Sequence, residues 1–194
     1  MNESFNYLRI ILTVVVGLGL TTALNALGKV IKFRPFIKVY WVAVLWEIGV
    51  LLMLLLHWYS VWVFHMIQDW TYLKFVLLLL PSFSLYVTSH LAFPEFQQGK
   101  KYDLEKFYYQ NRKYFFGAAA TYFVLDALQS RLILTAPWVT LDNGFRLFAI
   151  FIVIASARST SHRFHASASL MALATLVAYI FIFSNVPLSA QLQP

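Results

Sequence analysis

The sequence contains no cysteine, which excludes disulfide bonds, thiolate metal sites, iron–sulfur clusters and cysteine nucleophiles. It is also poor in charge. Aspartate, glutamate, lysine and arginine together make up 12% of its 194 residues, whereas a soluble domain has roughly 25%. Hydrophobic residues make up 60%. A chain of single-domain length with this composition is expected to fold in a membrane.

Catalytic and ligand-binding motifs are missing as well. The sequence has no Gly-x-Ser-x-Gly nucleophile motif, no phosphate-binding glycine loop and no His-Glu-x-x-His zinc motif. An enzyme is therefore not the favoured interpretation, and no catalytic residue, metal site or cofactor is predicted. The net charge of +7 comes from basic residues in short connections, where membrane topology explains them, so nucleic acid is not an expected partner.

Six apolar runs predict an all-α fold, a bundle of six transmembrane helices that forms a single domain. The runs cover residues 5–28, 39–64, 72–93, 114–134, 145–157 and 166–183. All but the fifth approach the ~20 residues that a spanning helix needs. Arg146 and Arg158 enclose only eleven residues of the fifth run, so it spans the membrane only with snorkelling arginines or inside the bundle. A five-span chain is the alternative.

The distribution of basic residues predicts the orientation of these helices. Eleven of the fifteen lysines and arginines lie in the first, third and fifth connections, which the positive-inside rule assigns to the cytoplasm. Both termini are then non-cytoplasmic. Two halves of three spans would enter the membrane in opposite senses, as in inverted-repeat transporters. However, Glu47 in the second run has no acidic counterpart in the fifth.

Two acidic residues lie deep in the predicted helices. Glu47 is about nine residues into its run, or ~14 Å at 1.5 Å per residue, and Asp126 is similarly deep. A charge at this depth costs ~2.5–3.5 kcal/mol and marks a candidate functional site. We predict an ion pathway formed by Glu47 and Asp126, with Asn25 and Arg131 as further polar members. The structural alternative pairs Asp126 within its own helix or with a neighbour such as Arg131 or Arg146, and leaves Glu47 protonated and hydrogen-bonded.

The fifth connection combines arginine with histidine. Arg158, His162, Arg163 and His165 offer suitable chemistry for an anion or a lipid headgroup, although a plain positive-inside loop is the alternative. His90 and His165 lie at matching depths of two predicted spans. They form the one pair that would suit a haem.

Two further segments carry specific expectations. His57, His65 and Asp69 lie near the outer end of the second run without a compact metal-ligand spacing, so we expect surface or interface roles. Residues 103–113 form a predicted cytoplasmic amphipathic helix that begins at an acidic cap and precedes the fourth span.

Several short motifs resemble a family of small six-span bacterial membrane proteins with no established activity. They are Pro94-Glu95, Phe107-Tyr108-Tyr109, Arg112-Lys113-Tyr114-Phe115-Phe116-Gly117, the intramembrane Asp126, and Arg163-Phe164-His165-Ala166. The resemblance covers most of the chain. It implies a helical bundle in the bacterial inner membrane and implies nothing about mechanism.

The intramembrane carboxylates make a small ion channel, or an ion- or proton-coupled transporter, the leading functional hypothesis. A bundle of this size is expected to assemble as a homo-oligomer or with other membrane proteins. The alternative is a non-catalytic structural or accessory subunit of a larger membrane complex, with the many aromatic residues as contacts.

Overall fold

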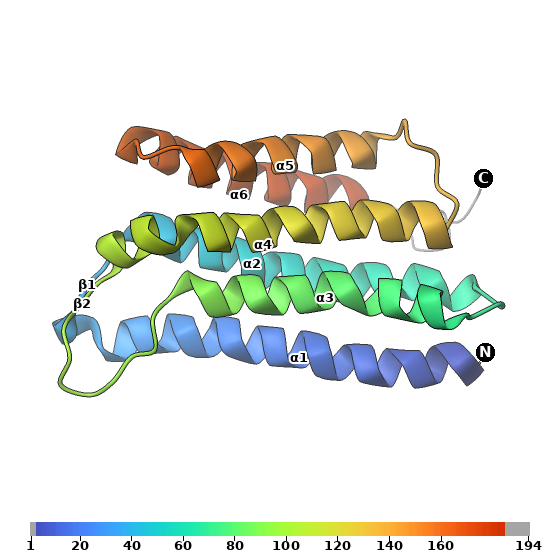
Figure 1. Ribbon diagram of the computed structural model, residues 1–194, viewed down its shortest axis with the longest axis horizontal. Coiled ribbons are helices and arrows are strands. Elements are labelled where there is room, and N and C mark those ends of the chain that lie inside the picture. Colours follow the sequence, from blue (N-terminus) through green and yellow to red (C-terminus); the bar gives the residue numbers. More distant parts are fainter. Residues whose placement is uncertain (1–2, 185–194) are drawn as a thin grey trace.

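The computed structural model describes residues 3–184, which form six α-helices (Figure 1). These are α1 (Glu3–Lys32), α2 (Trp41–Ser60), α3 (Tyr72–Ala92), α4 (Leu104–Ile133), α5 (Leu141–Arg158) and α6 (His162–Ser184). The helices lie along one another, and each runs opposite to the one before it (Figure 1). The start of α1 and the end of α6 therefore lie at the same end of the bundle. The all-α prediction is confirmed.

Four of these helices are long and apolar enough to cross a membrane. They are α1, α2 with the 3₁₀ turn that follows it (Val61–Met66), α3 and α6. Helices α4 and α5 lie beside them but contain more charged and polar residues. The predicted amphipathic segment 103–113 and the fourth apolar run are not separate elements. They form one continuous helix, α4, with no proline over residues 104–133.

The helices pack around the bundle in the order α1, α3, α4, α5, α6 and α2, and α2 also packs against α3. Leu12 of α1, Leu54 of α2 and Leu78 of α3 are fully buried in the resulting core. Gly19 of α1 leaves room for the Leu54 side chain, because a Cβ at residue 19 would lie 2.8 Å from a Leu54 methyl group. Between α2 and α4 the packing is sparse.

One end of the bundle is closed by a short polar clamp between distant segments. Strand β1 (Ile37–Lys38) pairs in parallel with β2 (Tyr102–Asp103), at the left of Figure 1. Lys38 Nζ lies 3.1 Å from Asp103 Oδ2 and 3.0 Å from Glu105 Oε2. His162 Nδ1, at the start of α6, lies 3.0 Å from Glu105 Oε1. The first, third and fifth connections therefore meet at one end, which is the end predicted to be cytoplasmic.

The Lys38–Asp103 pair of the clamp keeps its charges over a wide pH range. The backbone N–H of Lys106 and the ammonium of Lys38 lower the pKa of Asp103, so its contribution to stability is present above its ordinary pKa and is lost as the pH falls through the lowered value. Hydrogen bonds to Glu105 and Asp103 raise the pKa of Lys38, so its contribution is present below its ordinary pKa and is lost as the pH rises through the raised value. Both ions persist at neutral pH.

Candidate functional site

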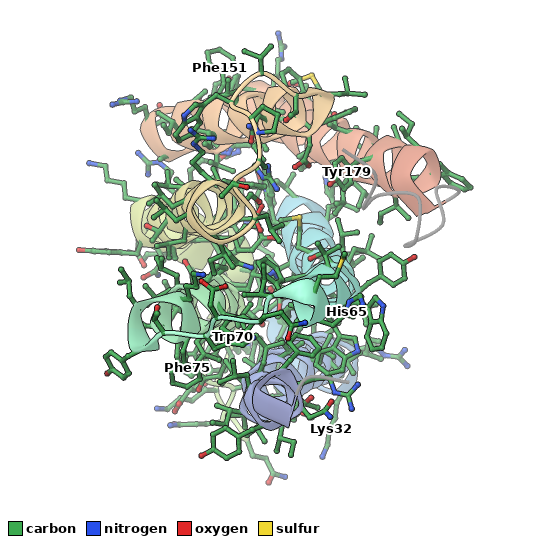
Figure 2. The ribbon with its side chains drawn as sticks, turned by 90° about the vertical axis from the view of Figure 1, so that its right-hand side faces the viewer. Lys32, His65, Trp70, Phe75, Phe151 and Tyr179 are labelled. Atoms are coloured by element: carbon green, nitrogen blue, oxygen red, sulfur yellow. The ribbon has the colours of Figure 1, made fainter. Side chains whose placement is uncertain are left out.

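The sparse packing between α2 and α4 leaves a cavity of about 180 Å³, which α5 and α6 help to enclose. Most of its wall is apolar. Aromatic rings from four helices contribute to the wall: Trp46, Phe115, Tyr122, Phe123, Phe145, Phe148 and Tyr179. Figure 2 shows Tyr179 on the side of α6 that faces the other helices, whereas Phe151 of α5 points away from the bundle.

A network of charged side chains forms one part of this wall. The guanidinium of Arg146 donates through Nε to Asp126 Oδ2 at 2.6 Å, which joins α5 to α4. Its Nη1 lies 2.5 Å from Asp142 Oδ2 and donates to Asn143 Oδ1 at 2.7 Å. Its Nη2 donates to Ser130 Oγ at 3.2 Å. Arg146 is thus the centre of a largely buried network that contains two carboxylates.

The local sequence explains how α5 contributes to this network. Thr140 accepts a hydrogen bond from the backbone N–H of Asn143 and so caps α5, which begins at Leu141 rather than at the predicted residue 145. The earlier start places Asp142 one helical turn before Arg146, on the same face. From α6, the Tyr179 hydroxyl donates to Asp142 Oδ1 at 2.7 Å.

His57 of α2 also lines the cavity, and its predicted surface or interface role is wrong. The side chain is 1% exposed. His57 follows the buried residues Val50 and Leu54 at helical spacing, which places it on the inner face of α2. Its Nε2 is 2.9 Å from Ser82 Oγ of α3, and its buried Nδ1 has no hydrogen-bond partner among the described residues.

Glu47 and Asp126 are not brought together. Glu47 is completely buried on the side of α2 that faces α3, where Ser89 Oγ donates to its Oε1 at 2.7 Å. Its Oε2 is buried and has no partner in the described part of the chain. Asp126 lines the cavity, whereas Glu47 does not. Of the structural alternatives for Asp126, the structure shows the pairing with Arg146.

The other predicted members of the ion pathway lie outside the cavity. Asn25 is exposed on α1. Arg131 is exposed near the end of α4, where it donates to the carbonyl oxygens of Thr135 and Ala136 and lies over the Trp138 ring. These contacts give hydrogen-bond donors to carbonyl groups that follow the end of α4.

The fifth connection divides into exposed and buried groups. Arg158, His162 and Arg163 are exposed at the clamp end of the bundle. His165 is buried, with Nδ1 2.7 Å from the Tyr108 hydroxyl and Nε2 3.1 Å from the Ser159 carbonyl oxygen.

The two haem candidates are held by different contacts. His90 is exposed and stacks on Tyr86 within α3. Because both ring nitrogens of His165 already have polar partners, that ring is fixed against α4 and the fifth connection. Neither ring is placed toward a common ligand.

Asp142 and Tyr179 are site residues that sequence reasoning missed. The spacing of Asp142 and Arg146 is a signal that was available, because residues four apart share a helix face. Tyr179 carries no such signal, since its partner lies on another helix. Comparison of the chain with protein-family models, with curated proteins and with solved structures finds no significant match. The interpretation of the site therefore depends on its geometry.

Proposed function

We propose that this chain is a small ion- or proton-coupled membrane transporter that binds its cargo in the cavity between α2, α4, α5 and α6. One observation carries the proposal: the wall of a cavity between apolar helices contains the network of Asp126, Arg146 and Asp142. Charges are costly at membrane depth and are found there mainly where they face a polar pathway.

The proposal places all six helices across the bilayer, with both termini non-cytoplasmic. Helix α5 turns Asp142 and Arg146 toward the cavity, while Leu147 and Phe151 are 67% and 69% exposed on its outer side. The mean hydropathy of α5 includes these inward-facing charges, so it is lower than the hydropathy of the outer surface of the helix alone. Its 18 residues measure ~27 Å, close to the thickness of the hydrocarbon core.

The proposal also includes the membrane that holds the protein and its assembly with lipid or with further copies of the chain. The resemblance of the sequence motifs supports the bacterial inner membrane, and the broad apolar exterior suits lipid or a second copy of the chain. The accessory-subunit function is the competing proposal. It predicts that a foreign membrane protein co-purifies in stoichiometric amount under mild detergent, whereas the transporter purifies alone or as a homo-oligomer.

Aqueous access to the cavity tests the transporter proposal. The chain has no native cysteine, so a single Ala149→Cys substitution places one thiol on the cavity wall. A membrane-impermeant trimethylammonium methanethiosulfonate is added to right-side-out and inside-out vesicles. We expect Ala149→Cys to react from at least one side. Phe151→Cys is the matched control on α5, because its outward thiol faces lipid and does not react.

The same labelling assay can overturn the transporter proposal. If Ala149→Cys is unreactive from both sides but reacts fully after denaturation in detergent, no aqueous pathway reaches the cavity. The transporter proposal is then overturned.

A further inference from the structure

The charges on the cavity wall favour a cationic ligand. Asp126 and Asp142 carry two negative charges and Arg146 carries one positive charge, so the network is left with a net charge of about −1. A buried site with an excess negative charge attracts a cation and repels an anion.

The guanidinium of Arg146 is already occupied by the protein. Its three nitrogens make contacts with Asp126, Asp142, Asn143 and Ser130. An anion would have to displace these contacts to reach it. Arg146 therefore holds the two carboxylates in place and is not an anion-binding group.

Asp126 and His57 offer acceptors on this wall that the described hydrogen bonds do not use. Both oxygens of Asp142 have partners, Tyr179 and Arg146, whereas the described hydrogen bonds of Asp126 engage only Oδ2. His57 supplies the second acceptor. With its proton on Nε2 and donated to Ser82, the partnerless Nδ1 presents a lone pair. A buried polar atom without a partner costs ~1–3 kcal/mol, and a ligand that binds it removes this cost.

The rest of the cavity suits an apolar body rather than a bare metal ion. A cavity of about 150 Å³ holds one benzene molecule, and this one measures about 180 Å³. Its aromatic rings, such as Tyr122 and Phe145, can lie against an organic cation. A small metal cation requires several hard ligands, and no group of three or more histidine, aspartate or glutamate side chains that could hold a metal ion is found among the described residues.

We propose that the cavity binds a monovalent organic cation, with its ammonium group between Asp126 and His57 and an apolar body the size of a phenyl ring. This inference rests on the proposed transporter function and names the class of its cargo. A primary ammonium group has three donors, of which two are used by Asp126 Oδ1 and His57 Nδ1.

A series of ligands with one apolar body and different charges tests the inference. The purified full chain in detergent is titrated by calorimetry at neutral pH with 2-phenylethylammonium, 2-phenylethanol and 3-phenylpropanoate. We expect the ammonium compound to bind at least ~10-fold more tightly than the alcohol, equivalent to ~1.4 kcal/mol, and the carboxylate to bind most weakly.

Matched variants identify the group responsible for the preference for the ammonium compound. Asp126→Asn should abolish the preference for the ammonium compound. Asp69→Asn should retain it, because Asp69 is exposed in the α2–α3 connection and pairs with Lys74. The variant proteins are compared by their thermal unfolding, so that loss of fold is separated from loss of charge.

Three results would overturn the inference: tighter or equal binding of the alcohol or the carboxylate, no binding of any compound, or an unchanged preference in folded Asp126→Asn. These results are distinct from failure of the transporter proposal. If Ala149→Cys is accessible but the ammonium compound is not preferred, the cargo class is wrong and transport stands. If the ammonium compound is preferred but Ala149→Cys is inaccessible, the binding site stands and transport is wrong.

Discussion

Arg146 is the residue on which the geometry of the cavity depends. It contacts two carboxylates and two neutral acceptors from α4 and α5, and its side chain is 14% exposed. A single cation that holds two acids in a partly buried site has a larger structural effect than an exposed ion pair. Removing it would leave Asp126 and Asp142 close together without compensation.

Arg146→Gln is therefore expected to destabilise the protein strongly. Removing one partner of a buried ion pair costs ~3–5 kcal/mol. Reversible unfolding in mixed detergent micelles measures the loss. Arg131→Gln is the control, since its contacts are exposed, and it should cost less than ~1 kcal/mol. Equal losses for the two variants would show that the network does not hold α4 and α5 together.

Glu47→Gln distinguishes the contribution of Glu47 to the charge of the cavity from that of Asp126. The ratio of labelling rates at Ala149→Cys with a cationic and an anionic methanethiosulfonate reports the charge of the cavity. We expect Asp126→Asn to lower this ratio by ~10-fold, in line with the loss of one nearby charge. Glu47→Gln should leave the ratio within ~2-fold, because Glu47 faces Ser89 and not the cavity. A similar decrease of this ratio for both variants would mean that Glu47 also contributes to the charge of the cavity.

Single residues were predicted from the sequence with unequal success. The position of Asp126 within an apolar run marked it as a candidate, and the structure places it on the cavity wall. Its partner and the burial of His57 depend on contacts between helices. Hydropathy along one helix contains no information about these contacts.

For the helices, apolar runs and polar capping residues determined how much was predictable. The bounds of α3 differ from the predicted run by one residue, because Thr71 caps its start and the chain becomes extended at Phe93. The start of α4 was predicted correctly from its acidic cap, Asp103, but its continuity with the fourth apolar run was missed, since a charged helical segment and an apolar one look like two elements in a hydropathy profile. The start of α5 was misjudged because Thr140 and Asp142 are polar.

The contact between α1 and α2 gives a prediction at this scale. Gly19→Ala would force the buried Leu54 side chain to move, whereas a Cβ at Gly17 meets nothing within 4 Å. Gly17→Ala should stabilise α1 by up to ~1 kcal/mol through helix propensity. Gly19→Ala should be less stable than Gly17→Ala by ~1 kcal/mol or more, because overpacking offsets that gain. Unfolding in detergent measures both, and indistinguishable variants would contradict the close approach.

For the whole molecule, the alternating directions of the helices predict which connections lie on each side of the membrane. Lys101→Cys lies before α4, Val139→Cys between α4 and α5, and Ser161→Cys before α6, all at exposed positions. In a six-span protein the first and third react with an impermeant thiol reagent from the cytoplasm, and Val139→Cys reacts from the other side. Reaction of all three from one side would mean that α4 and α5 do not cross the bilayer.

If the cavity between α2, α4, α5 and α6 is the cargo site, a bound amine should protect Ala149→Cys from thiol modification. The rate of thiol modification is measured with and without saturating 2-phenylethylammonium, in the native background and with Asp126→Asn. We expect the amine to slow modification by at least ~10-fold, and Asp126→Asn to weaken this protection. An unchanged modification rate in the presence of saturating amine would show that the cavity does not hold the cargo.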